Sequence, residues 1–257
     1  MKIGLIGFGK AGKAVANVIL QNPDFSLEWV LRNTKTLQLA SAKEFLGISS
    51  DDPAHIFSQQ NIDIHTLFEN HPVDFIIDFS TEDSIYTYGK AASEKGIKII
   101  SAISHYQEKE QEFLKKLSEN SVVFWSPNIT VGVNYLLFAA SLLKNIAPDV
   151  DIEVIEEHFK AKSGISGTAV KIAETLDIDA ESINSVRAGG IVGKHEVIFG
   201  FPYQTVRLVH ESISREAFGN GALFVAKNIK NKEKGYYNFE HILKPYFFND
   251  SQNAVSS

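Results

Sequence analysis

Short hydrophobic runs alternate with longer amphipathic stretches through the first half of this 257-residue chain. The short runs are nearly continuous in apolar residues, as in strands that are buried on both faces of a parallel sheet. The pattern therefore predicts an α/β domain. Between residues 32 and 70 it predicts only one element, a helix near residues 36–45. We expect strands at residues 2–6, 27–31, 73–79, 97–101 and 122–125, and helices at residues 10–20, 36–45, 82–95 and 108–119.

The pattern changes after Ser126. A strongly apolar helix is expected at residues 131–143, and long strand-like runs follow with few helices between them. This succession predicts a second, α+β domain built on an open, mixed or antiparallel sheet. An open sheet needs a cover on its exposed face, so we expect a homotetramer that forms through it. The strands are expected at residues 152–157, 182–189, 195–201 and 204–212, and a last helix at residues 215–230.

Three glycines follow the first predicted strand and open the first predicted helix. Gly7 permits a tight turn, Gly9 lets the backbone approach a pyrophosphate, and Gly12 lets the helix pack closely on the strand. The N–H groups at the start of the helix can then receive the phosphates. A tight turn without any ligand is the alternative. The segment predicted to bind a dinucleotide comprises Gly7, Phe8, Gly9, Lys10, Ala11 and Gly12.

This fingerprint makes the first domain Rossmann-like. We expect a dinucleotide-binding domain at residues 1–126 together with 216–257, and a substrate-binding and oligomerisation domain at residues 127–215. The final stretch, residues 252–257, is polar and is expected to be a disordered tail.

The end of the second predicted strand favours NADPH over NADH. An acidic residue about 20 positions after the glycines would bind the ribose 2′-hydroxyl, whereas an arginine nearby accommodates a 2′-phosphate. The strand end carries Arg32 and Lys35, while Glu28 lies inside the strand. We therefore expect NADPH to be preferred and NADH to be the second choice. If Arg32 and Lys35 are only solvated charges, this preference disappears.

Composition narrows the functional classes. The net charge of −6, without a lysine or arginine run, argues against a nucleic-acid or membrane-surface partner. The absence of cysteine excludes disulfides and thiolate zinc sites, and it fits a cytoplasmic protein. No metal-ligand spacing is present. His195 and His210 fall in predicted strands, where a histidine is more often a hydrogen-bonded sheet residue than a ligand, and we assign them no role.

One segment of the second domain holds the candidate chemistry. His158 and Lys162 can each deliver a proton when they are protonated. Ser166, Gly167 and Thr168 form a turn ahead of a helix-like run, and their hydroxyl and amide donors can hold a carboxylate. The segment therefore predicts a site that binds and protonates a small anionic substrate.

This segment resembles the signature of dihydrodipicolinate reductases, in which a histidine pair, a lysine and a Ser-Gly-Thr-Ala turn follow one another. His158 matches the first histidine, Lys162 the lysine, and residues 166–169 the turn. Further matches follow the order of the family along nearly the whole chain. They lie at residues 78–80, 126–134, 187–195 and 214–222.

The resemblance implies the NAD(P)H-dependent reduction of a cyclic α,β-unsaturated imine dicarboxylate, the step from dihydrodipicolinate to tetrahydrodipicolinate in lysine and diaminopimelate biosynthesis. It makes His158 and Lys162 the acid pair, and Ser166, Gly167 and Thr168 the carboxylate-binding turn. It also implies cofactor contacts from two loops of the first domain. These loops comprise Ser101, Ala102, Ile103, Ser126, Pro127, Asn128 and Ile129.

Three departures from the family pattern lie around the substrate and the nicotinamide. Phe159 stands in place of the second histidine, and the loop from Lys162 to Ser166 is one residue shorter and lacks its Asp and Pro. Residues 101–104 replace a Gly-Thr-Thr-Gly stretch. The chain is then either a divergent reductase of this family, or a paralogue with another imine or amino-acid substrate, or a non-catalytic NADP-binding scaffold or sensor. Because His158, Lys162 and the turn remain, we prefer the reductase.

Overall fold

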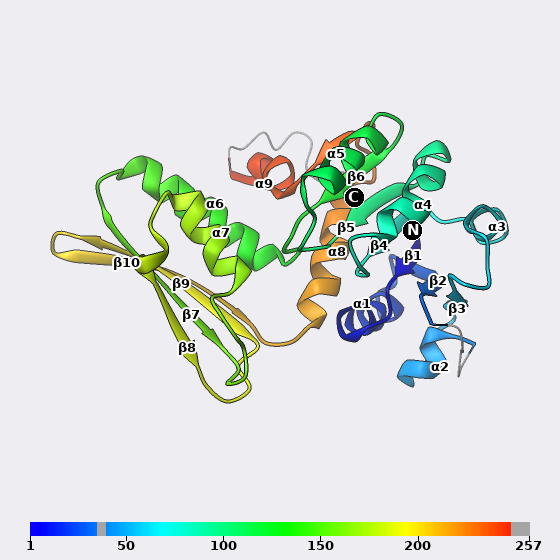
Figure 1. The fold of residues 1–257 in the computed structure, drawn as a ribbon, viewed down its shortest axis with the longest axis horizontal. Coiled ribbons are helices and arrows are strands. Elements are labelled where there is room, and N and C mark those ends of the chain that lie inside the picture. Colours follow the sequence, from blue (N-terminus) through cyan, green and yellow to red (C-terminus); the bar gives the residue numbers. More distant parts are fainter. Residues whose placement is uncertain (35–39, 248–257) are drawn as a thin grey trace. The chain divides into compact units, whose positions relative to one another are not determined.

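The structure is a computed structural model that describes residues 1–34 and 40–247. Its internal contacts divide the chain into two compact units, Met1–Ile129 with Phe218–Ser257, and Thr130–Ala217. Figure 1 shows the elements of each unit. The tail expected at residues 252–257 lies outside the described residues. Within the described ranges, no helix is both long enough and apolar enough to cross a membrane.

The first unit is built on a seven-stranded sheet in the order β11-β6-β5-β4-β1-β2-β3, and every neighbouring pair is parallel. The strand order reverses at β1, and ligands of such sheets bind outside the carboxyl ends of the strands at this point. The strands are β1 (Lys2–Ile6), β2 (Ser26–Arg32), β3 (His55–Ser58), β4 (Phe75–Asp78), β5 (Lys98–Ser101), β6 (Val122–Trp125) and β11 (Gly235–Tyr237).

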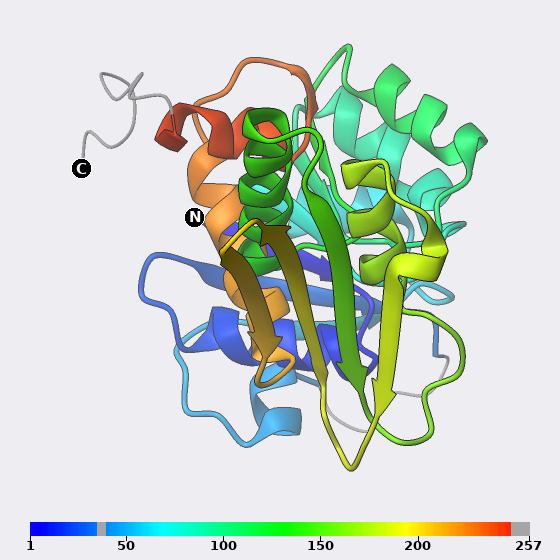
Figure 2. The same ribbon diagram turned by 90° about the vertical axis from the view of Figure 1, so that its left-hand side faces the viewer.

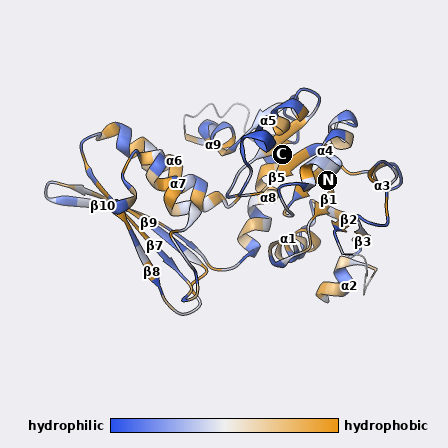
Figure 3. Ribbon diagram, in the orientation of Figure 1, coloured by the Kyte–Doolittle hydropathy of each residue, from blue (hydrophilic) through white to orange (hydrophobic). Residues whose placement is uncertain are grey.

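Buried aliphatic and aromatic side chains of these strands form the core with the helices, and Figure 3 shows hydrophobic residues along β4 and β5. Gly4 in β1 makes room for Trp29 of β2, because a Cβ atom at Gly4 would lie 2.1 Å from the indole ring. The helices of this unit are α1 (Lys10–Leu20), α2 (Ala42–Leu46), α3 (Ile64–Asn70), α4 (Ser84–Glu94), α5 (Glu108–Leu117), most of α8 (Glu216–Ile229), and α9 (Phe239–Phe247).

The structure confirms the strands predicted for this unit and corrects the helix predicted at residues 36–45. Residues 35–39 lie outside the described residues, and α2 begins only at Ala42. Its start is set by Ser41, whose hydroxyl accepts a hydrogen bond from Glu44 N–H (3.3 Å), and it ends at Gly47, which has a φ of 68°. A glycine in this left-handed conformation is a common helix terminator. The predicted pattern also lacked β3, α3, β11 and α9.

The second unit has a four-stranded sheet in the order β10-β9-β7-β8. The pairs β10–β9 and β9–β7 are antiparallel, whereas β8 lies parallel to β7, so the sheet is mixed. In Figure 2 the four strands lie side by side, with α6 and α7 behind them. The elements are α6 (Val131–Ile146), β7 (Asp151–His158), α7 (Gly167–Leu176), η1 (Ala180–Ser182), β8 (Ile183–Arg187), β9 (Gly193–Phe201) and β10 (Gln204–Ser212).

Strand β7 alternates between buried and more exposed residues, and this alternation decides which side chains meet the helices. Ile152 and Val154 are buried in the core that the sheet forms with α6 and α7, whereas Glu153 between them is exposed. Because side chains alternate along a strand, Glu156 and His158 continue the helix-covered face. The helix-covered face of β7 therefore begins with hydrophobic core residues and ends with Glu156 and His158.

Candidate active site

Three glycines shape the turn between β1 and α1. Gly7 has a φ of 93°, and a Cβ atom there would lie 2.6 Å from the Phe79 carbonyl oxygen. A Cβ atom at Gly12 would lie 2.2 Å from the Gly7 carbonyl oxygen, whereas one at Gly9 would meet no atom within 4 Å. Gly7 and Gly12 are thus required by the fold. Gly9 is not, and its open space lies where a pyrophosphate would approach the start of α1.

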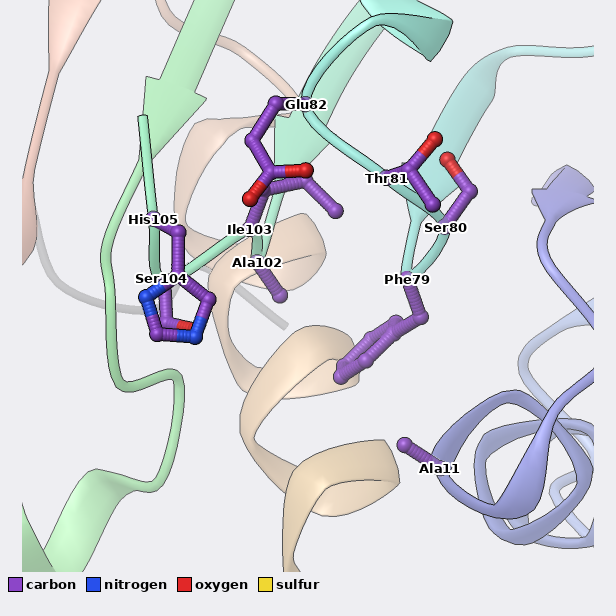
Figure 4. A pocket seen from close by; sticks show the side chains of 9 residues that line it. All are labelled: Ala11, Phe79, Ser80, Thr81, Glu82, Ala102, Ile103, Ser104 and His105. Atoms are coloured by element: carbon purple, nitrogen blue, oxygen red, sulfur yellow. The ribbon is translucent and has the colours of Figure 1, made fainter. Parts of the chain in front are cut away.

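A cavity of about 300 Å³ lies at the carboxyl ends of β4 and β5 in the first unit. In Figure 4 the Glu82 carboxylate and the His105 ring lie on the same side of the cavity, away from Ala11 and Phe79. The lining of this cavity brings together three residues that were predicted to contact the cofactor, Ala11, Ala102 and Ile103. The full lining comprises Ala11, Phe79, Ser80, Thr81, Glu82, Ala102, Ile103, Ser104 and His105.

Other predicted cofactor residues belong to the same unit but do not line this cavity. Phe8 packs edge-on against Phe45, with ring centroids 5.3 Å apart. Ser101 is fully buried, and its hydroxyl donates to Tyr106 Oη (3.0 Å). Ser126 Oγ donates to the Asn128 carbonyl oxygen (2.6 Å), which holds the turn that also contains Pro127 and Ile129. Lys10 is exposed in the first turn of α1.

Arg32 is the last residue of β2, at the position where a 2′-phosphate would be recognised. Its guanidinium donates to Thr34 Oγ1 (3.0 Å) and is partly exposed. Lys35, the second cation expected there, lies outside the described residues.

In the second unit, a row of four polar side chains crosses the whole sheet. Ser185 of β8 is the register partner of Glu156 in β7, Glu156 pairs with His195 of β9, and His195 pairs with His210 of β10. His195 and His210 are stacked, with ring centroids 6.3 Å apart. These side chains lie where the hydrophobic core ends, so the residues that were given no role in the sequence are neighbours of the candidate site.

His158 ends β7 and is 8% exposed. Its Nδ1 lies 2.5 Å from Glu156 Oε2. Burial lowers the pKa of His158, the Glu156 carboxylate opposes that shift, and the charges of Lys162 and Arg187 add to it. In the free protein the neutral imidazole is therefore favoured.

Glu156 is fully buried and held by three side chains. Besides the contact with His158, its Oε1 accepts hydrogen bonds from Ser185 Oγ (2.5 Å) and from the Arg187 guanidinium. Burial by itself would raise the pKa of Glu156. The hydrogen bonds from Arg187 and Ser185 outweigh that effect and lower the pKa to about 2, so the carboxylate is ionised.

Arg187 also fixes the loop that carries Lys162. Its Nε donates to the Lys162 carbonyl oxygen (3.1 Å) and its Nη2 to the Gly164 carbonyl oxygen (2.6 Å). Lys162 N–H donates in turn to the Phe159 carbonyl oxygen (3.0 Å). The shortened loop is thus a tight turn tied to β8. Phe159 itself is 41% exposed, so its ring presents an apolar surface beside the turn.

Ser166 caps the N-terminus of α7. Its Oγ accepts a hydrogen bond from Ala169 N–H (3.1 Å) and lies 3.1 Å from His195 Nε2. Gly167 begins the helix and is exposed, with open space where a Cβ atom would be, and Thr168 follows it. The N–H groups of a first helical turn and their positive dipole end suit a carboxylate.

His195 connects the two parts of the site. Its ring meets that of His158 edge-on, with centroids 5.3 Å apart, while its Nε2 faces Ser166. Burial lowers the pKa of His195 to about 4, so it is neutral in the physiological range. His195 is therefore a neutral, buried residue that contacts both His158 and Ser166, whereas the sequence indicated only a histidine in a strand.

Three possible metal ligands meet here: Glu156, His158 and His195. Each offers one ligand atom, and the three atoms lie within 4.8 Å of one another. His158 Nδ1 and Glu156 Oε2, however, are only 2.5 Å apart. Two ligands of a tetrahedral zinc ion, each about 2.0–2.1 Å from the metal, are about 3.3 Å apart. The Arg187 guanidinium already compensates the charge of Glu156. His158 Nδ1 and Glu156 Oε2 are therefore too close together to bind one tetrahedral zinc ion, and the contact is a close carboxylate–imidazole pair.

The predicted acid pair and carboxylate turn thus lie in one region of the second unit, with Glu156, Arg187 and His195 as additional members. Glu156 precedes His158 by two residues in a predicted strand. This spacing places both side chains on the same face, so the sequence could have predicted that they lie close together. Arg187 and His195 arrive from β8 and β9, so only the strand register brings them here.

The chain is similar to known proteins over nearly its whole length. A family model described as "Dihydrodipicolinate reductase, N-terminus" matches residues 1–129, and one described as "Dihydrodipicolinate reductase, C-terminus" matches residues 131–243. The 4-hydroxy-tetrahydrodipicolinate reductase of Thermosipho africanus is 34% identical over 72% of this chain and 86% of its own length. That of Caldanaerobacter subterraneus subsp. tengcongensis is 27% identical over 92% of this chain and 95% of its own.

Solved structures share the fold. The dipicolinate-bound dihydrodipicolinate reductase from Paenisporosarcina sp. TG-14 aligns with a TM-score of 0.77 and 21% identity, covering 95% of this chain and 99% of its own. The C. glutamicum DAP dehydrogenase in complex with DAP aligns with a TM-score of 0.56 and 10% identity, covering 93% and 92%. Since both family models match and together span the two units, the chain belongs to the dihydrodipicolinate reductase family.

Proposed function

We propose that this protein catalyses the NAD(P)H-dependent reduction of dihydrodipicolinate to tetrahydrodipicolinate in lysine and diaminopimelate biosynthesis. One hydride and one proton add across a double bond of a cyclic imine dicarboxylate. The nicotinamide cofactor, when bound, supplies the hydride. The second unit supplies the acid and the carboxylate-binding turn.

The observation that carries this proposal is the arrangement of His158 and Ser166 around His195. The His195 ring contacts His158 and its Nε2 faces the hydroxyl that caps α7. A proton donor and an anion-binding helix start are thereby held by one buried residue, and these are the two functions that reduction of an imine dicarboxylate requires.

His158 is suited to take up its proton together with the substrate. Burial lowers its pKa in the free protein, whereas a dianionic substrate beside the ring would favour the charged imidazolium. The acid is then formed where it is used and can protonate the substrate as the hydride arrives. Lys162, in the loop that Arg187 fixes, is the second cation of the pair.

We further propose that NADPH is preferred to NADH. The support is Arg32 at the end of β2, where its cation can meet a 2′-phosphate. The phosphates would lie on the N–H groups at the start of α1, approached through the open space at Gly9. The loops after β4, β5 and β6 would hold the nicotinamide end. Each of these positions belongs to the first unit.

We also propose that the protein is a cytoplasmic homotetramer assembled through the open face of the second sheet. The support is that this face carries exposed apolar side chains at Val186 and Val209 between ion pairs such as Lys194–Glu157. Burial of such a face in a symmetric assembly would remove the apolar surface from water.

Turnover tests the proposed function. Purified protein, NADPH and the product of the preceding lysine-pathway synthase are mixed, and the absorbance of the reduced nicotinamide is followed. We expect it to fall, and His158→Ala and Lys162→Ala each to lower kcat roughly a hundredfold or more. NADPH that binds without being oxidised would contradict the proposal. Wild-type rates in both variants would remove these residues from the mechanism.

A further inference from the structure

The buried Glu156 carboxylate divides its two oxygens between different partners. Oε1 accepts from Ser185 and Arg187, and Oε2 faces His158 Nδ1 at 2.5 Å. The carboxylate is completely buried, so water does not compete for either oxygen. A carboxylate on a histidine ring nitrogen usually fixes both the tautomer and the orientation of that ring.

We propose that Glu156 is the positioning residue of His158, holding the hydrogen on Nδ1 so that Nε2 is the nitrogen that delivers the proton. An ionised carboxylate accepts hydrogen bonds and has none to donate, so the facing Nδ1 must carry a hydrogen. The inference rests on the proposed function only for the part that His158 plays in catalysis. The tautomer itself is a property of the protein without substrate.

Gly193 supports the assignment of Nε2. A Cβ atom at Gly193 would lie 3.1 Å from His158 Nε2, which is closer than such contacts normally are. The φ of Gly193 lies outside the left-handed region, so the backbone does not demand a glycine there. The missing side chain instead keeps the Nε2 edge of the ring clear, while Nδ1 is buried against Glu156.

Charged and titratable groups face His158 from each neighbouring element. Glu156 is on its own strand, Arg187 comes from β8, His195 from β9, and Lys162 from the following loop. Lys162 and Arg187 favour the neutral ring, as burial does, and Glu156 alone among these groups favours the charged ring. Removing its charge therefore has one expected direction: the pKa of His158 falls.

Glu156→Gln reverses the hydrogen-bond polarity at the ring. Ser185 and Arg187 both donate, so they retain the amide oxygen, and the amide NH₂ then points at Nδ1. That nitrogen must become an acceptor, which moves the hydrogen to Nε2. We expect the pKa of His158 to fall by about one pH unit or more, as for loss of an opposite charge at this range.

The matched control is Glu157→Gln. Glu157 is the next residue of β7 and carries the same charge. It pairs with Lys194 at 2.7 Å instead of with His158. The variant therefore reproduces the change in net charge and in the strand without touching the ring contact.

The test is ¹⁵N NMR of the histidine side chains in the full-length protein without substrate, with His158 assigned by difference from His158→Gln. We expect a predominantly Nδ1–H tautomer in the wild type and in Glu157→Gln, and a predominantly Nε2–H tautomer with a lowered pKa in Glu156→Gln. An unchanged tautomer and pKa in Glu156→Gln, or equal changes in both variants, would overturn the proposal. Turnover is measured in parallel: if the wild type fails to reduce the substrate while the tautomer still inverts, the proposed function fails and the positioning role stands.

Gly193→Ala is a second variant that keeps the proposal falsifiable if Glu156→Gln does not fold. It leaves Glu156 intact and crowds Nε2, so the Nδ1–H tautomer should persist while kcat falls about tenfold or more, as when a reacting group is displaced. Wild-type kcat in a folded Gly193→Ala protein would contradict delivery of the proton from Nε2.

Discussion

Ser166 Oγ lies 3.1 Å from His195 Nε2 and accepts a hydrogen bond from Ala169 N–H at the same distance. One hydroxyl thus both caps helix α7 and ties its first turn to strand β9. The N-terminus of α7 is consequently fixed relative to the residues at the end of β7. A carboxylate that binds there would meet a preorganised turn.

Ser166→Ala should cost more than the loss of an ordinary helix cap. Losing an N-cap costs about 1 kcal/mol, and leaving the buried His195 nitrogen without a partner adds about 1–3 kcal/mol. Ser41→Ala is the matched comparison, since Ser41 is a buried serine that caps α2 through Glu44 N–H. Hydrogen exchange of the α7 and α2 amides measures both losses. Equal losses in the two helices would contradict a stabilising contact between Ser166 and His195.

The sequence predicted elements well where the hydrophobic pattern was long and strong. Strands β1, β2, β4, β5 and β6 are largely buried and stood out as apolar runs. The short strand β3 and the helix α3 lie in a polar stretch without such a signal. The direction of β8 relative to β7 could not be read at all, because alternation is the same in parallel and antiparallel strands.

Site residues that are close in the sequence could be predicted, whereas those that strand pairing brings together could not. His158, Lys162 and Ser166 are close in the sequence, so their pattern alone suggested an acid and an anion site. Arg187 and His195 join them only through the register of β8 and β9 on β7. A shift of one residue in the β8 pairing would turn Arg187 to the other face of the sheet, and the same shift in the β9 pairing would turn His195. The hydrophobic pattern does not fix such pairings.

Gly9→Ala should weaken cofactor binding without unfolding the protein. A Cβ atom at Gly9 would meet nothing within 4 Å in the protein itself, but it would occupy the space through which a pyrophosphate approaches. We expect the Kd for NADPH, measured by fluorescence titration, to rise at least tenfold at unchanged Tm. Gly190→Ala, also at a glycine with open space, is the control. If Gly9→Ala binds NADPH as the wild type does, the phosphates lie elsewhere.

Arg32→Asp should act on one cofactor more than on the other. The carboxylate would repel a 2′-phosphate and accept a hydrogen bond from a 2′-hydroxyl. The KM for NADPH is therefore expected to rise much more than the KM for NADH in steady-state kinetics. Equal changes in the two constants would show that Arg32 does not recognise the 2′-phosphate.

Asp78 should make the stability of the first unit depend on pH. It is fully buried at the end of β4, and burial raises its pKa from 3.8 to about 6, although hydrogen bonds from Ser80 and Tyr88 oppose the shift. Between these values the unfolded chain has lost the proton that the folded protein keeps. This group therefore lowers the free energy of unfolding by about 3 kcal/mol as the pH rises from about 4 to about 6. Above pH 6 its contribution no longer changes.

Asp78→Asn removes that titration. We expect urea unfolding to show the variant gaining stability relative to the wild type as pH rises through this window. Asp63→Asn is the control: the backbone N–H of Thr66 lowers the pKa of Asp63 from 3.8, so its titration lies below this window and its difference from the wild type should stay constant from pH 4 to pH 7. A difference between Asp78→Asn and the wild type that stays constant from pH 4 to pH 7 would show that Asp78 does not titrate there.

The reaction itself is tested most directly by following the transferred hydride. NADPH carrying deuterium at the transferable position of nicotinamide C4 is incubated with the protein and dihydrodipicolinate, and the product is analysed by mass spectrometry and NMR. We expect one deuterium on a ring carbon of tetrahydrodipicolinate, and strongly reduced labelling with His158→Ala in the same time. Bound NADPH that keeps its deuterium in the presence of the substrate would contradict a reductase acting on this imine.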